Sequence, residues 1–182
     1  MDGELIVDLG GVGHVNGVIT VNLQKHVEPD IICDITASTA QLEQYIMRNE
    51  VDKFVCIHTL EHLFPGEYVP SMRYWREFLR PGGELLIVVP DMMGIWQDVT
   101  LGKIMVDVAL SITYTLGYPL GSHKWGWADS TLRRDMHAAG YKNIREADYP
   151  KFWTYNYPGY EYTGAVGTYQ VPNLCLLGEN NV

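Results

Sequence analysis

The chain alternates short apolar runs with segments in which apolar residues recur every three or four positions. This alternation is typical of a parallel β-sheet with helices packed on its faces. The runs are rich in Val, Ile and Leu and mix in few polar residues, which predicts strands that are buried on both faces. The pattern predicts seven strands, at residues 5–9, 18–23, 30–35, 53–58, 84–89, 142–147 and 173–177.

Other segments have the periodicity of helices. The spacing predicts helices at about 40–48, 68–79, 99–116 and 129–139. Asp129 or Ser130 is expected to cap the last of these helices, because a short polar side chain accepts hydrogen bonds from the first turn. Gly140 is expected to end that helix, and the Arg80–Gly83 turn is expected to end the helix at 68–79.

The connection between the first two predicted strands is unusually short. About eight residues separate them, whereas a parallel crossover normally needs a dozen or more and usually contains a helix. We therefore expect the first crossover helix to be missing or reduced to a turn. The sequence also begins at the first strand, so we expect no helix before it, and we expect dimer contacts to cover the sheet face that is left open.

Composition narrows the class of protein. A chain of 182 residues with 47% hydrophobic and 19% charged residues predicts one globular domain spanning residues 1–182. The net charge of −9 argues against binding to nucleic-acid phosphates and favours small or neutral substrates. Cys33, Cys56 and Cys175 lie in apolar runs without metal-binding spacing, which predicts a reduced cytoplasmic protein. We expect no signal peptide and no membrane span.

Candidate binding residues fall where the predicted strands end. Ligands of open parallel sheets bind beyond the carboxyl ends of the strands. The first strand runs into Gly10 and Gly11, which let a ligand approach the backbone closely, although a plain tight turn explains them equally well. Asn22 and Asp34 end the next two strands and could hydrogen-bond a ribose and an adenine. A turn or capping role is the alternative for Asp34.

Two histidines and a glutamate follow the fourth predicted strand. His58 is expected to face the ligand crevice, and His62 is interpreted as a core or supporting histidine. The segment raises the question of a metal site. Because His58 and His62 straddle a junction between strand and helix, they need not share a face, and we predict no metal site.

These motifs together resemble those of class I S-adenosylmethionine-dependent methyltransferases. The resemblance is closest to the type 11 group, in a branch with a short glycine loop. The matching segments are the glycine-rich motif at 5–13, the acidic strand at 30–35, the Leu-Glu-His signature at 58–63, the Pro-Gly-Gly turn and strand at 78–91, and the segments at 123–127, 139–141 and 173–178. The resemblance implies a Rossmann-like, mostly parallel seven-stranded sheet of order 3-2-1-4-5-7-6 with an antiparallel last strand.

The resemblance also implies S-adenosylmethionine as the cofactor and assigns its binding residues. Asp8, Gly10, Gly11 and Gly13 would line the methionine side, Asn22 the ribose, Asp34 and Ile35 the adenine, and His58, Thr59 and Leu60 the floor. The ribose position is usually acidic in this family. Asn22 has one side-chain oxygen where a carboxylate has two, and it carries no charge.

The function implied is methyl transfer to a small-molecule or glycan acceptor. The alternative is a non-catalytic, cofactor-binding member of the same fold, suggested by the compressed first motif. A nicotinamide-dependent dehydrogenase is disfavoured, because the loop has no third glycine in place and no room for a helix. If the acceptor must lose a proton, the candidate bases are His62, Asp91 and His123.

An aromatic segment before the last strand is the candidate acceptor wall. Its rings are Phe152, Trp153, Tyr155, Tyr157, Tyr160, Tyr162 and Tyr169. Hydroxyl-bearing aromatic side chains suit a sugar or a planar acceptor, whereas packing of the loop or a dimer face are the alternatives.

Overall fold

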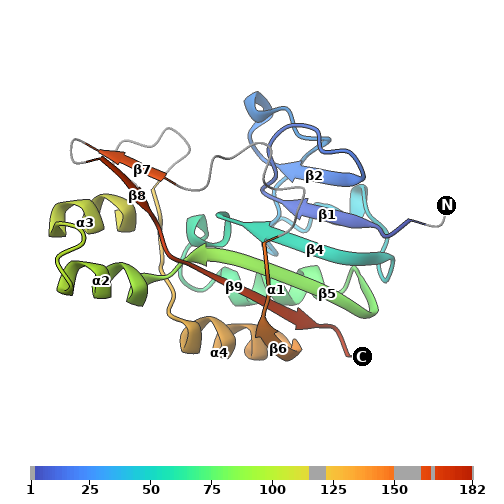
Figure 1. Ribbon diagram of the computed structural model, residues 1–182. Coiled ribbons are helices and arrows are strands. Elements are labelled where there is room, and N and C mark those ends of the chain that lie inside the picture. The colour runs from blue at the N-terminus through green and yellow to red at the C-terminus, as the bar shows by residue number, and fades with distance from the viewer. Residues whose placement is uncertain (1–2, 115–121, 150–160, 165–166, 182) are drawn as a thin grey trace.

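A seven-stranded sheet forms the centre of the computed structural model, which describes residues 3–114, 122–149, 161–164 and 167–181 (Figure 1). The strands are β1 (Ile6–Leu9), β2 (Val18–Asn22), β3 (Ile31–Ile32), β4 (Val51–Ile57), β5 (Leu79–Pro90), β6 (Lys142–Glu146) and β9 (Asn173–Glu179). Their order is β3-β2-β1-β4-β5-β9-β6, with β9 antiparallel to both of its neighbours. This order and the antiparallel strand confirm the predicted fold.

The first crossover is as short as the sequence predicts. β1 and β2 pair in parallel, with Ile6 opposite Val18. The residues between them form turns and one isolated bridge between Val15 and Val18, and no helix. The chain therefore returns to the same sheet edge without the helix that normally covers such a connection.

Four helices accompany the sheet in the described part of the chain. They are α1 (Tyr68–Arg76), α2 (Met92–Thr100), α3 (Val106–Tyr114) and α4 (Asp129–Ala139), with short 3₁₀ turns η1 (Lys25–Val27), η2 (Leu42–Gln44) and η3 (Leu60–His62). The helix expected at 40–48 is wrong, because only η2 forms there. Ala40 has a left-handed backbone (φ 47°), and the Gln41 side chain folds back to accept a hydrogen bond from the Asp34 N–H.

The helix expected at 99–116 is confirmed in part: α3 covers Val106–Tyr114, whereas residues 99 and 100 are the end of α2. The break follows α2, where Gly102 has a φ of 69° and Lys103 forms an ion pair with Asp98. The start of α4 differs by one residue from the prediction. Ala128 is its N-cap, and its N–H donates to the Thr131 hydroxyl. Gly140 ends α4 in a left-handed conformation, as expected.

Helices α1 and α4 pack on the sheet and contribute to one core. The larger buried cluster joins Met72 and Trp75 of α1 and Leu132 and Met136 of α4 to strand residues such as Phe54. A smaller cluster contains no helical residue and consists of Val55, Ile57, Leu86, Val88 and Leu177. The apolar side chains of β4 and β5 therefore alternate between two buried clusters, and helices of the described ranges contribute to only the larger one.

An outer lobe lies at the carboxyl edge of the sheet. It consists of α2, α3 and a hairpin of two strands, β7 (Glu161–Gly164) and β8 (Gly167–Gln170). The sequence analysis did not predict this hairpin. Ile95, Val108, Ile112 and Val171 form its core, and the Tyr169 hydroxyl donates to Asp98 at 2.7 Å. Figure 1 shows the carboxyl ends of β1, β2, β4 and β5 pointing toward this lobe.

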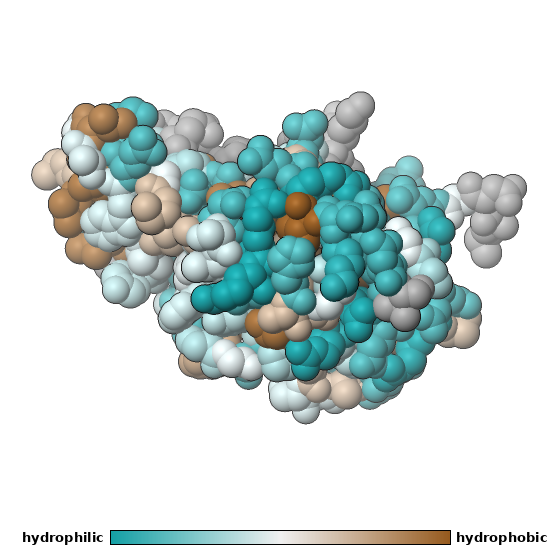
Figure 2. All heavy atoms as spheres, turned by 90° about the horizontal axis from the view of Figure 1, so that it is seen from below, coloured by the Kyte–Doolittle hydropathy of each residue, from teal (hydrophilic) through white to brown (hydrophobic). Residues whose placement is uncertain are grey.

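The outer lobe exposes apolar side chains. Figure 2 shows them gathered at the end of the molecule formed by α2 and α3, whereas most of that face is hydrophilic. The exposed residues there include Met93, Leu101, Met105 and Val106. No helix in the described ranges combines the length and the apolar character needed to span a bilayer.

The Pro-Gly-Gly turn has a different role from the one predicted. Helix α1 ends at Arg76, before the turn, and the turn lies within β5. The buried Asn180 holds it: the side-chain amide donates to the Leu79 carbonyl at 2.9 Å, the backbone N–H donates to Gly83 at 2.8 Å, and the backbone carbonyl accepts from Gly82 at 2.7 Å. The end of β9 is thereby fastened to the start of β5.

Removing this side chain tests the fastening. Asn180→Ala leaves the buried Leu79 carbonyl without its donor, so we expect the free energy of unfolding to fall by about 1 to 3 kcal/mol. Asn181→Ala is the matched control, because Asn181 is exposed, and it is expected to change stability by less than about 0.5 kcal/mol. Urea denaturation of both variants measures the difference, and equal effects would contradict the fastening role.

Candidate functional site

Main-chain hydrogen bonds hold the glycine loop after β1 against β2 and η1. The Gly10 N–H donates to the Val21 carbonyl and the Gly13 N–H to Val27, both at 2.7 Å, while the Gly11 N–H reaches the Asp8 carbonyl at 3.3 Å. These N–H groups are therefore engaged within the protein. Asp8 itself is buried.

Gly10 allows the loop to pack against the end of β4. It has a φ of 94°, and a Cβ built there would lie 2.0 Å from Oγ1 of Thr59. The Thr59 hydroxyl donates in turn to the Ile57 carbonyl at 3.0 Å. The end of β1 and the end of β4 are therefore in close contact at a position where only glycine fits.

Asn22 braces the same loop from β2. Its side-chain amide donates to the carbonyls of Gly10 at 2.9 Å and Gly11 at 3.2 Å, and its Oδ1 accepts from the Gln24 N–H at 2.9 Å. A carboxylate cannot donate, and it would face two carbonyl oxygens. The brace gives a physical reason for an amide where the family usually has an acid. The Oδ1 atom, which accepts from Gln24, keeps a second lone pair.

A second brace was missed by sequence reasoning. The Thr20 hydroxyl lies 2.8 Å from the Gly13 carbonyl, and the Asp30 carboxylate accepts from the Thr20 N–H at 2.8 Å and lies 2.8 Å from His14. Burial raises the pKa of Asp30, but the hydrogen bonds from Thr20 and His14 lower it more, so the carboxylate stays ionised. No sequence spacing predicts these contacts, because Thr20 in β2 meets Gly13 and Asp30 only once the chain has folded.

Asp34 and Ile35 follow β3 at the same edge. Asp34 accepts the Thr36 N–H on Oδ1 at 2.8 Å, which is the turn role weighed as its alternative. Its other carboxylate oxygen accepts no hydrogen bond from the described residues, and the side chain is half-buried. Ile35 is buried, and its carbonyl accepts from the Trp75 indole at 2.6 Å. The turn therefore fixes Asp34 while one of its oxygens stays available.

His58 lies in a conformation that is unusual for a side-chain-bearing residue. Its φ is 48°, directly after β4. Such strained positions concentrate at functional sites. The His58 ring turns toward Glu61, with Nδ1 at 3.3 Å from Oε1. Leu60, expected in the cofactor floor, is fully buried in the core.

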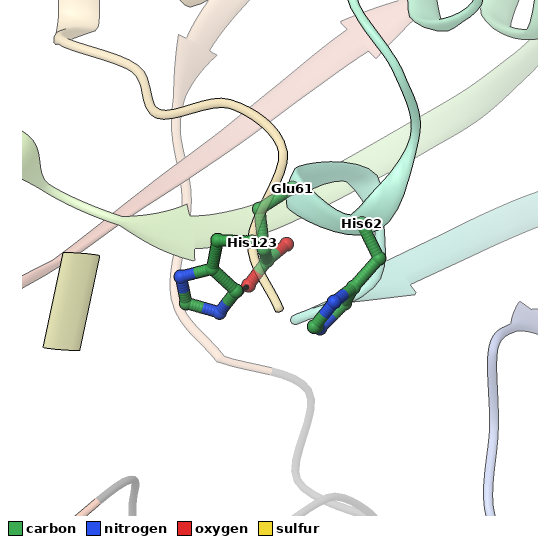
Figure 3. Close-up of side chains that lie close together, drawn as sticks. All are labelled: Glu61, His62 and His123. Carbon is green, nitrogen blue, oxygen red and sulfur yellow. Dashed lines mark ion pairs between the residues drawn. The ribbon is translucent and has the colours of Figure 1, made fainter. Parts of the chain in front are cut away.

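The structure brings Glu61, His62 and His123 together, although 60 residues separate the two histidines (Figure 3). The Glu61 backbone carbonyl accepts from the N–H of Lys124 at 2.7 Å, which holds the segment before α4 against η3. Nε2 of His123 lies 3.8 Å from Oε1 of Glu61, and the rings of His62 and His123 meet edge to face at 5.0 Å. Sequence reasoning did not pair these residues, because only the tertiary contact shows it.

The electrostatics of this group follow from burial. Burial raises the pKa of the Glu61 carboxyl, but the hydrogen bond from His58 and the neighbouring histidines lower it more, so its pKa lies below the ordinary value. Burial also lowers the pKa of His123, against the opposing charge of Glu61. Glu61 is therefore a buried carboxylate and His123 a neutral imidazole at neutral pH.

The remaining predicted residues divide by position. Asp91 is the N-cap of α2, and its Oδ1 accepts a hydrogen bond from the Met93 N–H at 3.0 Å. One oxygen of this carboxylate is therefore used to cap the helix. Tyr169 lies in the outer lobe. The other predicted aromatic residues, Phe152, Trp153, Tyr155, Tyr157, Tyr160 and the Tyr162 side chain, lie outside the described residues.

Solved structures share this fold. A SAM-dependent methyltransferase from Archaeoglobus fulgidus is 10% identical with a TM-score of 0.55, covering 98% of this chain and 86% of its own. A Bacillus halodurans protein proposed to be a methyltransferase is 13% identical with a TM-score of 0.59, covering 100% and 94%. A SAM-dependent methyltransferase from Thermotoga maritima is 9% identical with a TM-score of 0.58, covering 99% and 84%.

These similarities define the class of fold. The chain has the Rossmann-like fold of class I SAM-dependent methyltransferases, which confirms the expectation from the sequence motifs. No protein-family model matches the sequence, and a comparison with curated proteins finds no relative.

Substitution of Gly10 tests whether the loop depends on close packing. Gly10→Ala places a methyl group on the Thr59 side chain in a left-handed backbone, so we expect stability to fall by about 2 to 4 kcal/mol. Gly17→Ala is the matched control. Gly17 has a φ of 79° and no atom within 4 Å of a built Cβ, so only the backbone cost of about 1 kcal/mol applies. Equal losses in urea denaturation would contradict the packing account.

Proposed function

We propose that the protein is a SAM-dependent methyltransferase that acts on a small-molecule or glycan acceptor. The observation that carries the proposal is the sheet order with its antiparallel β9, which leaves the glycine loop, Asn22, Asp34 and Thr59 along one carboxyl edge. Ligands of open parallel sheets bind at this edge.

The residues present fit the nucleoside half of the cofactor. Asp34 has a carboxylate oxygen that can accept an adenine amino group, and Ile35 beside it is apolar. Oδ1 of Asn22 can accept a ribose hydroxyl while the amide keeps the loop in place. The methionine half has fewer donors, because the N–H groups of Gly10 and Gly13 already bind Val21 and Val27.

When bound, S-adenosylmethionine supplies a methyl group activated on a sulfonium. The chain's own contribution is then to orient the acceptor and exclude water. An acceptor that must lose a proton needs a base. His62, half-buried in the η3 turn beside the ionised Glu61, is the best placed of the three candidates, because Asp91 caps a helix and His123 is buried.

The outer lobe favours a small acceptor. It stands at the carboxyl edge of the sheet, where connecting segments usually determine which substrate is bound. The net charge of −9 disfavours a polyanionic substrate. A cytoplasmic location and a homodimer stay predictions from the sequence.

A non-catalytic, cofactor-binding role is the second candidate. One observation favours it: the engaged N–H groups of the glycine loop leave little to orient the methionine end. A protein of this kind would bind the nucleoside and transfer no methyl group.

Calorimetric titration with S-adenosylhomocysteine tests the proposal. We expect binding by the wild type and about tenfold weaker binding by Asp34→Asn, which keeps the Oδ1 acceptor for Thr36 but loses the charge. Asp129→Asn on α4 is the matched control, since Asp129 faces Arg133 and should leave the affinity unchanged.

The outcomes separate the candidates. No heat with millimolar ligand contradicts both. Binding with transfer of labelled methyl from S-adenosylmethionine to a panel of hydroxyl and amine acceptors supports the methyltransferase. Binding together with no transfer across that panel supports the non-catalytic role instead.

A further inference from the structure

The Glu61, His62 and His123 group has features that a proton-transfer role does not need. One nitrogen or oxygen atom from each residue lies within 4.8 Å of those of the other two. Glu61 and His62 belong to the η3 turn after β4, and His123 comes from the segment before α4. Figure 3 shows the Glu61 carboxylate between the two imidazole rings.

The backbone holds these two segments in register. The Glu61 carbonyl accepts from the N–H of both Lys124 at 2.7 Å and Trp125 at 3.3 Å. The ring nitrogen Nδ1 of His62 lies 3.4 Å from the Ser122 carbonyl. The three side chains are therefore placed by main-chain contacts across η3 and not by chance encounter of long side chains.

The Glu61 carboxylate is incompletely paired where it lies. Its side chain is 1% exposed, and Oε2 has no hydrogen-bond partner among the described residues. The other oxygen, Oε1, lies 3.3 Å from Nδ1 of His58 and 3.8 Å from Nε2 of His123, both longer than an ordinary charged hydrogen bond. A buried carboxylate oxygen without a partner is costly, and such groups are usually paired or coordinate a metal.

The histidines are oriented as metal ligands are. A carbonyl oxygen only accepts, so the contact with Ser122 places the proton of His62 on Nδ1 and leaves the lone pair on Nε2. His123 hydrogen-bonds the backbone of Thr113 and turns Nε2 toward Glu61. Hydrogen bonds of this kind from ligating histidines to carbonyls fix the ring orientation in metal sites.

We propose that Glu61, His62 and His123 form a binding site for a zinc-type divalent cation. Two imidazoles and one carboxylate are the ligand set of open zinc sites, which keep a fourth position for water or substrate. Zinc–ligand distances of about 2.0–2.1 Å in a tetrahedron place ligand atoms about 3.4 Å apart. Side-chain rotations that move these atoms by up to about 1.4 Å would therefore bring the three ligands to zinc-binding distances.

The site stands at the carboxyl edge from which the acceptor would enter. The inferred role, which rests on the proposed methyltransferase function, is to hold an acceptor oxygen in the open position. With a cation bound, His62 is a ligand, and the cation takes the place of His62 as the group that activates the acceptor. A cation there lowers the pKa of a bound hydroxyl group. The metal site itself rests only on the geometry of the three side chains.

Metal titration of the full chain tests the proposal. The protein is first dialysed against a chelator and then titrated with zinc chloride by calorimetry and with cobalt chloride by visible absorption. We expect one equivalent to bind, with the absorption of tetrahedral cobalt. His62→Ala and His123→Ala should each weaken binding by about 100-fold or more, since each removes a ligand.

His26→Ala is the matched control, because His26 is an exposed histidine in η1 outside the group, and it should bind the metal as the wild type does. Circular dichroism confirms that each variant is folded. His62 is only half-buried, so His62→Ala is expected to fold, and it tests the site even if His123→Ala does not fold.

Two results would overturn the proposal. One is a folded wild type that binds neither metal at millimolar concentration, which leaves Glu61 as a partner that orients histidines for proton transfer. The other is metal binding that survives in His62→Ala. Titration of the same samples with S-adenosylhomocysteine keeps the two proposals separate, since nucleoside binding without metal overturns only the metal site.

Discussion

The short parallel crossover between β1 and β2 is the constraint on which the candidate site depends. With eight residues there is no room for a helix, so the loop between the strands must be stabilised by other contacts. Asn22 donates to two loop carbonyls, Thr20 contacts Gly13, and Gly10 packs on Thr59. Within this loop the N–H groups of Gly10, Gly11 and Gly13 are also used inside the protein, because they donate to the carbonyls of Val21, Asp8 and Val27, respectively.

The sequence predicted the sheet better than the segments around it. Strands buried on both faces are continuous apolar runs, so β1 and β2 were found to within one residue at each end and β4 and β9 to within two. β5 begins five residues before its predicted start, because it includes the Pro-Gly-Gly turn. The helix expected at 40–48 failed because one left-handed residue, Ala40, and a side-chain contact of Gln41 override helical periodicity. The β7–β8 hairpin was missed because its sequence was interpreted as a connection rich in aromatic residues.

In the candidate site, too, local motifs predicted which residues are present but not the contacts that those residues make. Local motifs identified Gly10, Asn22 and Asp34, because strand ends bring such residues to one edge. They did not show that the Asn22 amide is a brace, since that depends on where the loop carbonyls point. The group formed by Glu61, His62 and His123 depends on a contact between segments 60 residues apart. No spacing rule predicts such a contact.

The central claim is that the carboxyl edge of this sheet binds a nucleoside beside a braced glycine loop. A crystal structure of the protein with S-adenosylhomocysteine tests it most directly. The account predicts the adenine amino group within hydrogen-bond distance of the Asp34 carboxylate and a ribose hydroxyl on Oδ1 of Asn22, with the Asn22 amide still bound to Gly10 and Gly11. A ligand bound away from β2 and β3, or a loop released from Asn22, would contradict it.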